Sequence, residues 1–210
     1  MTSLYLFHFR IRNCMTFDHL QAIFWSLTYI VLIFYAVKYR AHAIPLIAVC
    51  LNFAWETLAL IGSIMLGRFS SALYIHISWF TLDLVMVLLY LFHETKIHEN
   101  KVEKCRFLVA YLLFAACLAG MFLSGYMLES CFIIDFIMAV SFVLFIVYER
   151  SPKSRLLYLI GILKLLGDLF AWQYYKNKDF VNLIGICVLL CNIGYMLILL
   201  KKDFPKHSGA

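Results

Sequence analysis

Long stretches of hydrophobic residues, separated by short polar segments, dominate the chain. Each is about as long as the roughly 20 residues that an α-helix needs to cross a bilayer core of about 30 Å. They cover residues 20–37, 43–66, 72–93, 107–128, 131–148, 156–172 and 179–200. The pattern predicts an all-α membrane protein: a single bundle of seven transmembrane helices within residues 20–200, with tails at 1–19 and 201–210.

The distribution of lysine and arginine predicts how this bundle is oriented, because the cytoplasmic loops of membrane proteins are enriched in both residues. The N-terminal tail and the segments after the second, fourth and sixth helices contain five, namely Arg10, Arg12, Arg68, Lys176 and Lys178. The other segments contain twelve, namely Lys38, Arg40, Lys96, Lys101, Lys104, Arg106, Arg150, Lys153, Arg155, Lys201, Lys202 and Lys206. We therefore expect the N-terminus outside the cell or in a lumen, and the C-terminus in the cytoplasm.

The composition agrees with a membrane environment. Of the 210 residues, 64% are hydrophobic and only 14% are charged, and the mean hydropathy is +0.88. A soluble domain of this size has no means of hiding so much apolar surface from water. The net charge of +6 follows from the basic cytoplasmic side and its contact with anionic lipids, so no nucleic-acid partner is expected. The seven cysteines do not indicate a disulfide framework, since no C-x-x-C pair is present and Cys50, Cys117, Cys187 and Cys191 lie inside apolar stretches, as small core residues do.

Five charged residues lie at membrane depth within the predicted helices, where a charge costs about 2.5–3.5 kcal/mol on insertion scales. They are Glu56, Asp83, Asp135, Lys164 and Asp168. With the predicted orientation, all five fall between the bilayer centre and its outer half. Because their depths agree, we expect them to share one cavity within the bundle.

Helical spacing places further polar and aromatic residues beside these charges, since residues three or four apart share one face of a helix. The resulting groups are Asn52 with Glu56, Trp79 with Asp83, Lys164 with Asp168 and Trp172, and Asn192 with Tyr195. Lipid would reject such faces, so we expect them to point into the bundle.

Structural roles compete with functional ones for several of these residues. Lys164 and Asp168 could form an ion pair within one helix that only neutralises both charges. Asp135 lies close enough to the membrane interface to be solvated. Asn52 and Asn192 suit interhelical hydrogen bonds, a common use of asparagine in membranes.

Glu56 is the residue that a structural role explains least well. It lies deep in apolar sequence, and its own helix has no basic residue within one turn. Burial in apolar surroundings favours the neutral carboxyl over the carboxylate, so Glu56 is a candidate proton donor. His76 lies nearer the predicted outer interface and is interpreted as a solvated interfacial histidine.

Several short motifs resemble those of the small integral-membrane terpene cyclases of fungal meroterpenoid and indole-diterpene pathways, a family with bacterial relatives. L-N-F-A-W-E at 51–56 resembles the family's N-x-x-W-E signature, and W-F-T-L-D-L at 79–84 resembles its W-x-x-x-D stretch. M-A-V-S-F at 138–142 and I-L-K-L-L-G at 162–167 are similar to its M-S-x-x-F and K-x-x-G stretches. Chain length, helix count, spacing and predicted topology also fit, so the resemblance spans most of the chain.

The resemblance implies an enzyme that cyclises a prenyl chain attached to an aromatic or other head group. Such enzymes usually begin by protonating a terminal epoxide, and they need no metal. In agreement, this sequence has no D-D-x-x-D run and no D-x-D-D cluster. We therefore expect no metal or other cofactor, and we expect a lipophilic prenylated substrate and membrane lipids as partners. The implied location is the endoplasmic reticulum for a fungal source and the plasma membrane for a bacterial one.

The resemblance also implies roles for single residues, with one departure. Glu56 matches the acid of the N-x-x-W-E motif. The family's second acidic residue belongs to a D-x-x-Y stretch on helix seven, where this chain has N-I-G-Y at 192–195. An amide is no general acid, although it can hold a carboxyl by hydrogen bonds. Asp168, on the neighbouring helix at similar depth, is the preferred substitute, with Asp83 and Asp135 as alternatives; otherwise the chemistry itself differs.

The leading hypothesis is therefore a proton-initiated cyclase. Glu56 protonates an epoxide or alkene, and Asn52 orients its carboxyl. Aromatic faces then stabilise the carbocation, while Asp83 or Asp168 stabilises it further or removes the final proton. The expected substrate-binding residues are Asn52, Trp55, Trp79, Asp135, Lys164, Trp172, Asn192 and Tyr195.

Two other functions remain open at this point. Intramembrane charges commonly mark proton or substrate pathways, which favours a proton-coupled transporter. However, the sequence has neither a visible internal repeat nor matched helices broken by glycine or proline. Helix count and topology alone support a seven-helix receptor, and the short loops disfavour it.

Overall fold

A computed structural model describes residues 2–41, 43–65, 71–97, 101–148 and 155–203, and this part of the chain forms seven α-helices. They are α1 (Thr2–Tyr39), α2 (Leu46–Met65), α3 (Ser71–Ile97), α4 (Lys101–Leu123), α5 (Met127–Tyr148), α6 (Arg155–Tyr175) and α7 (Asp179–Asp203). Each contains a span long and apolar enough to cross a membrane. The predicted all-α, seven-helix membrane fold is therefore confirmed.

The helix ends differ from the predicted hydrophobic stretches at two places. Helix α1 begins at Thr2, although its membrane-crossing span covers only His19–Tyr39, so the predicted N-terminal tail is largely helical. Helix α4 ends at Leu123, whereas its stretch was predicted to reach residue 128. Apolar residues continue through the α4–α5 turn, and hydropathy alone therefore places this boundary incorrectly.

Gly125 is the reason that α4 ends where it does. Its φ of +83° lies in the left-handed region, which glycine adopts without a steric penalty. The Gly125 amide donates to the Phe122 carbonyl at 3.0 Å, and the Tyr126 amide donates to the Met121 carbonyl at 2.9 Å. This pair of bonds is a Schellman motif, which satisfies the last carbonyls of a helix. The chain then reverses directly into α5.

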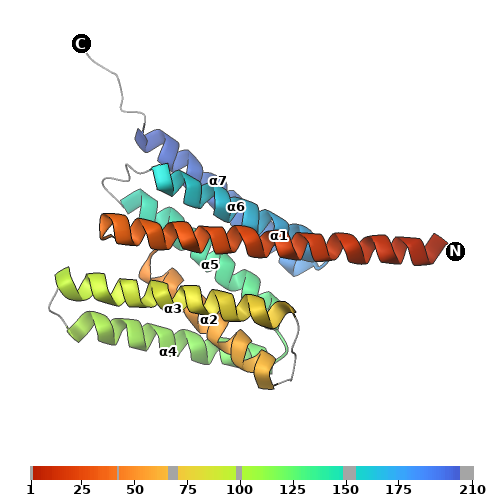
Figure 1. The fold of residues 1–210 in the computed structure, drawn as a ribbon, viewed down its shortest axis with the longest axis horizontal. Coiled ribbons are helices and arrows are strands. Elements are labelled where there is room, and N and C mark those ends of the chain that lie inside the picture. Colours follow the sequence, from red (N-terminus) through yellow and green to blue (C-terminus); the bar gives the residue numbers. More distant parts are fainter. Residues whose placement is uncertain (1, 42, 66–70, 98–100, 149–154, 204–210) are drawn as a thin grey trace, which may run out of the picture.

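The helices form a closed ring with one helix outside it. Successive helices run in alternating directions (Figure 1). Helix α1 packs against α3 and α6, α6 against α7, α7 against α5, α5 against α2, and α2 against α3. Helix α4 covers this ring from outside, against α2, α3 and α5. The six helices of the ring therefore surround one shared interior.

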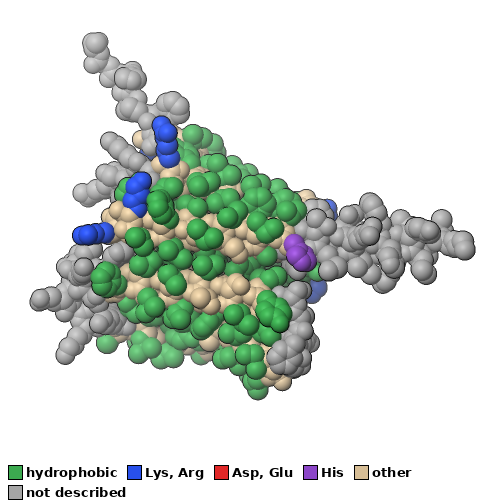
Figure 2. Space-filling model, in the orientation of Figure 1, with side chains coloured by type: hydrophobic (Ala, Val, Ile, Leu, Met, Phe, Trp, Pro, Cys, Tyr) green, Lys and Arg blue, Asp and Glu red, His purple; other side chains and the backbone are tan. Residues whose placement is uncertain are grey.

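The outer surface of the bundle is apolar, as a lipid-facing surface must be. Figure 2 shows hydrophobic side chains over most of one face, with lysine and arginine gathered mainly at the side where α1 ends. Leu88, Leu113 and Leu190, on three different helices, are 58%, 61% and 62% exposed. Of the basic residues that predict the orientation, Arg68, Arg150, Lys153 and Lys206 lie outside the described residues. The orientation itself stays a prediction.

Candidate functional site

A partly open cavity lies inside the ring of helices. Its lining comes from α1, α2, α3, α5 and α6, namely Gln21, Trp25, Tyr29, Asn52, Trp55, Glu56, Trp79, Cys131, Phe132, Ile134, Asp135, Met138, Ala171 and Tyr175. Because neighbouring helices run in opposite directions, most of these positions fall in the half of the bundle that holds the α2–α3, α4–α5 and α6–α7 connections, and Asn52 and Met138 lie near its middle.

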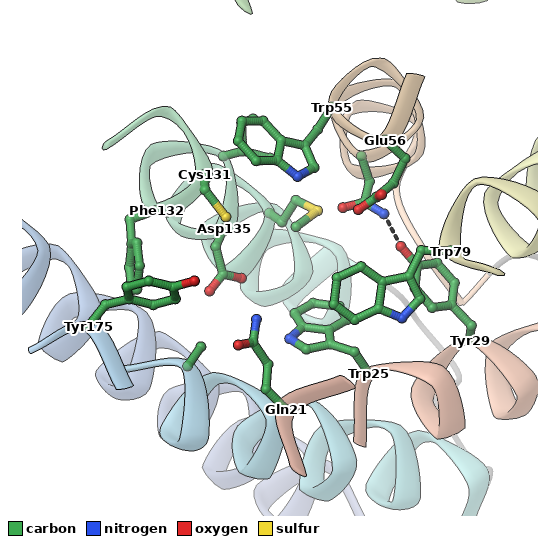
Figure 3. Close-up of a pocket in the computed structure, with 14 residues that line it drawn as sticks. Gln21, Trp25, Tyr29, Trp55, Glu56, Trp79, Cys131, Phe132, Asp135 and Tyr175 are labelled. Carbon is green, nitrogen blue, oxygen red and sulfur yellow. Dashed lines mark hydrogen bonds between the residues drawn. The ribbon is translucent and has the colours of Figure 1, made fainter. Parts of the chain in front are cut away.

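Aromatic rings and a few polar groups share this lining. Six of the lining residues are aromatic, and Figure 3 shows Trp25, Trp55 and Trp79 around the side of the cavity that holds Glu56. The Trp79 indole is held in place by its N–H, which donates to Ser26 Oγ of α1 at 3.1 Å. The combination of apolar walls and few polar groups is typical of a site for a lipophilic ligand.

Glu56 lines the cavity and has a partner from another helix. It is only 2% exposed, and its Oε2 lies 2.9 Å from Nδ1 of His76 on α3. The His76 side chain is 17% exposed and so connects Glu56 with the surroundings of the bundle. The interpretation of His76 as a solvated interfacial histidine did not include this contact with Glu56. Sequence spacing along α2 showed no basic neighbour because this neighbour belongs to α3.

Asn52 and Asp83 form a second buried group, together with Tyr29. The Asn52 Nδ2 donates to both carboxylate oxygens of Asp83, at 3.1 and 2.8 Å, and to the Tyr29 hydroxyl, as the dashed line in Figure 3 marks. Asp83 is 2% exposed and lies behind the cavity lining. Asn52 thus orients the carboxyl of Asp83, rather than the carboxyl of Glu56 as the sequence predicted.

Lys164 joins two carboxylates at the other side of the cavity. Its ammonium donates to Asp168 Oδ2 at 2.5 Å on its own helix and to Asp135 Oδ1 of α5 at 3.1 Å. It also lies 4.7 Å from the centroid of the Trp25 ring. Asn192 of α7 donates to the same Asp168 oxygen at 2.6 Å. The pair within α6 that the spacing predicted is therefore part of a larger cluster, in which one lysine faces two aspartates.

The predicted site residues divide between the cavity and the structure behind it. Asn52, Trp55, Glu56, Trp79 and Asp135 line the cavity, whereas Asp83, Lys164, Asp168 and Asn192 support it from behind. Two further predicted residues, Trp172 and Tyr195, do not line the cavity and form hydrogen bonds elsewhere. The Trp172 indole donates to Asn182 Oδ1 at 2.9 Å, and the Tyr195 hydroxyl donates to the Leu157 carbonyl at 3.3 Å.

Sequence reasoning missed the contribution of the first helix. Gln21, Trp25 and Tyr29 recur at four-residue intervals along one face of α1, and all three line the cavity. None carries a charge, so the search for intramembrane charges passed over them. The i, i+4 repeat of large amphipathic side chains was the signal that would have found them.

Gly167 allows the Trp25 indole to lie against α6. A Cβ at residue 167 would lie 2.9 Å from Trp25 Cδ1 and 3.1 Å from its Nε1. We expect Gly167→Ala to displace the indole and to destabilise the fold by about 1–3 kcal/mol, the usual cost of overpacking. Thermal unfolding in detergent and the tryptophan emission spectrum measure both effects.

Gly194→Ala is the matched control for this substitution. Gly194 is also helical, and a Cβ there would have no atom within 4 Å. We expect this variant to unfold at the wild-type temperature or slightly above it, because alanine favours helix over glycine. Equal behaviour of the two variants would contradict the close contact between Gly167 and Trp25.

Comparison with known proteins adds one finding to this geometry. The family model of the Pyr4-like transmembrane terpene cyclases matches residues 5–144, a stretch that runs from α1 to α5. It contains Glu56, His76, Asp83 and Asp135, whereas Lys164 and the rest of α6 and α7 lie beyond it. No curated protein and no solved structure matches the chain.

Proposed function

Because this chain belongs to the Pyr4-like transmembrane terpene cyclases, we propose that it cyclises a prenylated lipophilic substrate by proton initiation, with Glu56 as the acid and without a metal ion. The protonated group is a terminal epoxide or an alkene of the prenyl chain. The single observation that carries this proposal is the position of Glu56. A buried carboxyl at the wall of an aromatic cavity is suited to give a proton to an apolar ligand.

The reaction requires one proton to enter the substrate and one to leave it. The Glu56 proton goes to the epoxide oxygen as a carbon–oxygen bond breaks, and the electron pair of an alkene closes the ring on the carbon left positive. The positive charge moves along the prenyl chain as each further ring closes. Loss of a proton from a neighbouring carbon then forms a double bond, so that product and substrate are isomers.

The aromatic lining supports this proposal because a carbocation needs stabilisation without capture. The faces of Trp25, Trp55 and Trp79 border the cavity, and each can attract a cation by about 0.5–2 kcal/mol. Indole rings do not form a lasting bond to the cation in the way that water or a free carboxylate would. The apolar walls also limit the amount of water near the reacting chain.

His76 is suited to return a proton to Glu56 after each turnover. Its Nδ1 lies 2.9 Å from Glu56 Oε2, and its side chain is partly exposed. We expect His76→Gln to lower kcat by roughly 10²-fold, the lower end of general acid–base contributions, with little change in KM. Glutamine can keep a hydrogen bond to Glu56 but cannot carry a proton. A His76→Gln enzyme with the wild-type kcat would leave His76 with a positioning role only.

An assay of product mass tests the proposed function. Membranes containing the wild-type protein are incubated with farnesylated and geranylgeranylated aromatic acids and with their terminal epoxides, and products are separated by chromatography and mass spectrometry. We expect a new product of unchanged mass from at least one epoxide. If folded wild-type protein makes no isomer from any of these probes, the proposed function is wrong.

A further inference from the structure

We propose that Asp135 is the base that ends the cyclisation and that Lys164 is the positioning residue that holds it in place. This inference rests on the proposed function, and it gives the second carboxylate of the reaction a position on α5. The observations that carry it are the direction of the Asp135 side chain, the ion pairs of Lys164, and the charge of the cluster that these residues form.

Access to the substrate distinguishes Asp135 from the other carboxylates near the cavity. Its side chain is 14% exposed and belongs to the cavity lining, whereas the side chain of Asp168 is 1% exposed and lies behind it. Figure 3 shows the Asp135 carboxyl pointing into the cavity near Gln21 and Tyr175, on the side away from Glu56. The acid and the proposed base therefore border different sides of one space.

This separation suits a reaction in which the positive charge moves. Glu56 gives its proton to one end of the prenyl chain, and the charge then migrates as rings close. The group that removes the last proton must lie where the charge arrives, which is away from the acid. A carboxylate beside the acid would instead compete for the proton that starts the reaction.

Lys164 prepares Asp135 to accept a proton. The ammonium contacts Oδ1 of Asp135 at 3.1 Å, and this charge-assisted contact fixes the direction of the carboxyl group toward the cavity. The 4.7 Å distance from the same ammonium to the Trp25 ring fixes its place at the cavity wall. Lys164 itself is 3% exposed and does not line the cavity.

Asp168 keeps Lys164 paired when Asp135 loses its charge. One ammonium and two carboxylates carry one net negative charge, which attracts the cation toward Asp135. When Asp135 takes the proton it becomes neutral, and Lys164 stays paired with Asp168 at 2.5 Å. No buried charge is then left without a partner, which would be costly. Asn192 holds Asp168 in this position through its 2.6 Å hydrogen bond.

The terminating step balances as a simple proton transfer. The C–H bond next to the last cationic carbon breaks, its electron pair becomes the new double bond, and the proton goes to an Asp135 oxygen. Asp135 then releases that proton to water at the cavity opening, and Glu56 regains one from the surroundings. No oxidant or reductant takes part, and the net reaction remains an isomerisation.

The product distribution of Asp135→Asn tests the assignment. The variant keeps Glu56, so we expect it still to consume the epoxide of the prenylated aromatic acid that the wild type converts. We expect the wild-type isomer to fall by about tenfold or more as a share of products, replaced by other alkene isomers or a hydrated product. Asp135→Glu should restore part of the wild-type share. Glu129→Gln, an acid-to-amide control on the same helix outside the cavity lining, should leave it unchanged.

A second variant tests the positioning role of Lys164. We expect Lys164→Gln to shift the product shares in the same direction as Asp135→Asn, and the double variant to show no further shift. Product shares do not depend on how much enzyme is folded, so a merely structural role would leave them unchanged.

The outcomes separate this inference from the proposed function. If wild-type protein makes no isomer, the proposed function fails and this inference fails with it. If the wild type makes the isomer and Asp135→Asn makes the same product shares at the same rate, only the assignment of Asp135 is overturned. Wild-type shares in Lys164→Gln, with altered shares in Asp135→Asn, would overturn the role of Lys164 alone.

Discussion

Glu56→Gln should abolish detectable cyclisation, with kcat reduced by roughly 10²–10⁴-fold, the range over which general acid catalysis contributes. Glutamine has nearly the same shape as glutamic acid and can still hydrogen-bond to His76 Nδ1, which lies 2.9 Å from the carboxyl. It has no acidic proton to give to an epoxide. The fold and the shape of the cavity should therefore survive while the first step of the reaction stops.

Substrate binding provides the control for this variant. Trp25, Trp55 and Trp79 are three of the four tryptophans of the chain, and all three line the cavity. A prenylated probe that binds should therefore change tryptophan emission in Glu56→Gln as it does in the wild type. Normal binding without turnover supports the acid role. Turnover at the wild-type rate would show that another group starts the reaction.

The sequence predicts how deep in the membrane each charged side chain lies, and the similar depths of these side chains predicted that they share a cavity. Charges are rare in lipid, so the positions of Glu56 and Asp135 along their helices indicate the depth at which the interior of the bundle is polar. Helical spacing then added Asn52 to the face that carries Glu56. All three line the cavity, because Asn52 and Glu56 lie near the middle of α2 and the opposite direction of α5 brings Asp135 to a similar depth.

Rotation of each helix about its axis was much harder to predict. Asp83 and Asp168 have suitable depths, yet both point behind the cavity wall toward neighbouring helices. Trp172 is one turn beyond Asp168 but packs against α7, where its indole meets Asn182 and Gly185. Depth and spacing along one helix do not say which neighbour a side chain faces. That choice depends on interhelical packing.

The charges around Lys164 explain why an asparagine can occupy residue 192, where the resemblance implied an acidic residue. The resemblance implied an acid on the seventh helix, and Asp168 was the preferred substitute. Asn192 and Asp168 are in fact hydrogen-bonded, at 2.6 Å, but both are buried behind the cavity. A third carboxylate beside Lys164 would add negative charge to a cluster that already has two. The amide instead donates a hydrogen bond, which such a cluster needs.

The charge balance of this cluster leads to the largest expected effect on stability. Lys164→Met removes the only ammonium that the described residues place between Asp135 and Asp168. Breaking a buried ion pair from one side costs about 3–5 kcal/mol, because the remaining charge loses its partner. We expect a loss of this order in Lys164→Met, measured as the free energy of unfolding in detergent with increasing SDS.

Lys178→Met is the matched control, because Lys178 also pairs with a carboxylate but at the surface. Its ammonium lies 3.5 Å from Glu129 Oε1, and its side chain is 58% exposed. Exposed pairs contribute only about 0–1 kcal/mol, so this variant should unfold much like the wild type. Equal stability of the two variants would contradict a buried ion pair at Lys164.

A double variant separates charge from packing. In Lys164→Met with Asp168→Asn, one of the two unpaired carboxylates becomes neutral, so part of the lost stability should return. Lys164→Met with Asn182→Ala should show no such recovery, since Asn182 bonds to Trp172 rather than to this cluster. Recovery in the first combination alone would mean that Lys164 stabilises the bundle through the charges it neutralises. Loss of that lysine would then also release the Asp135 carboxyl from its position at the cavity wall.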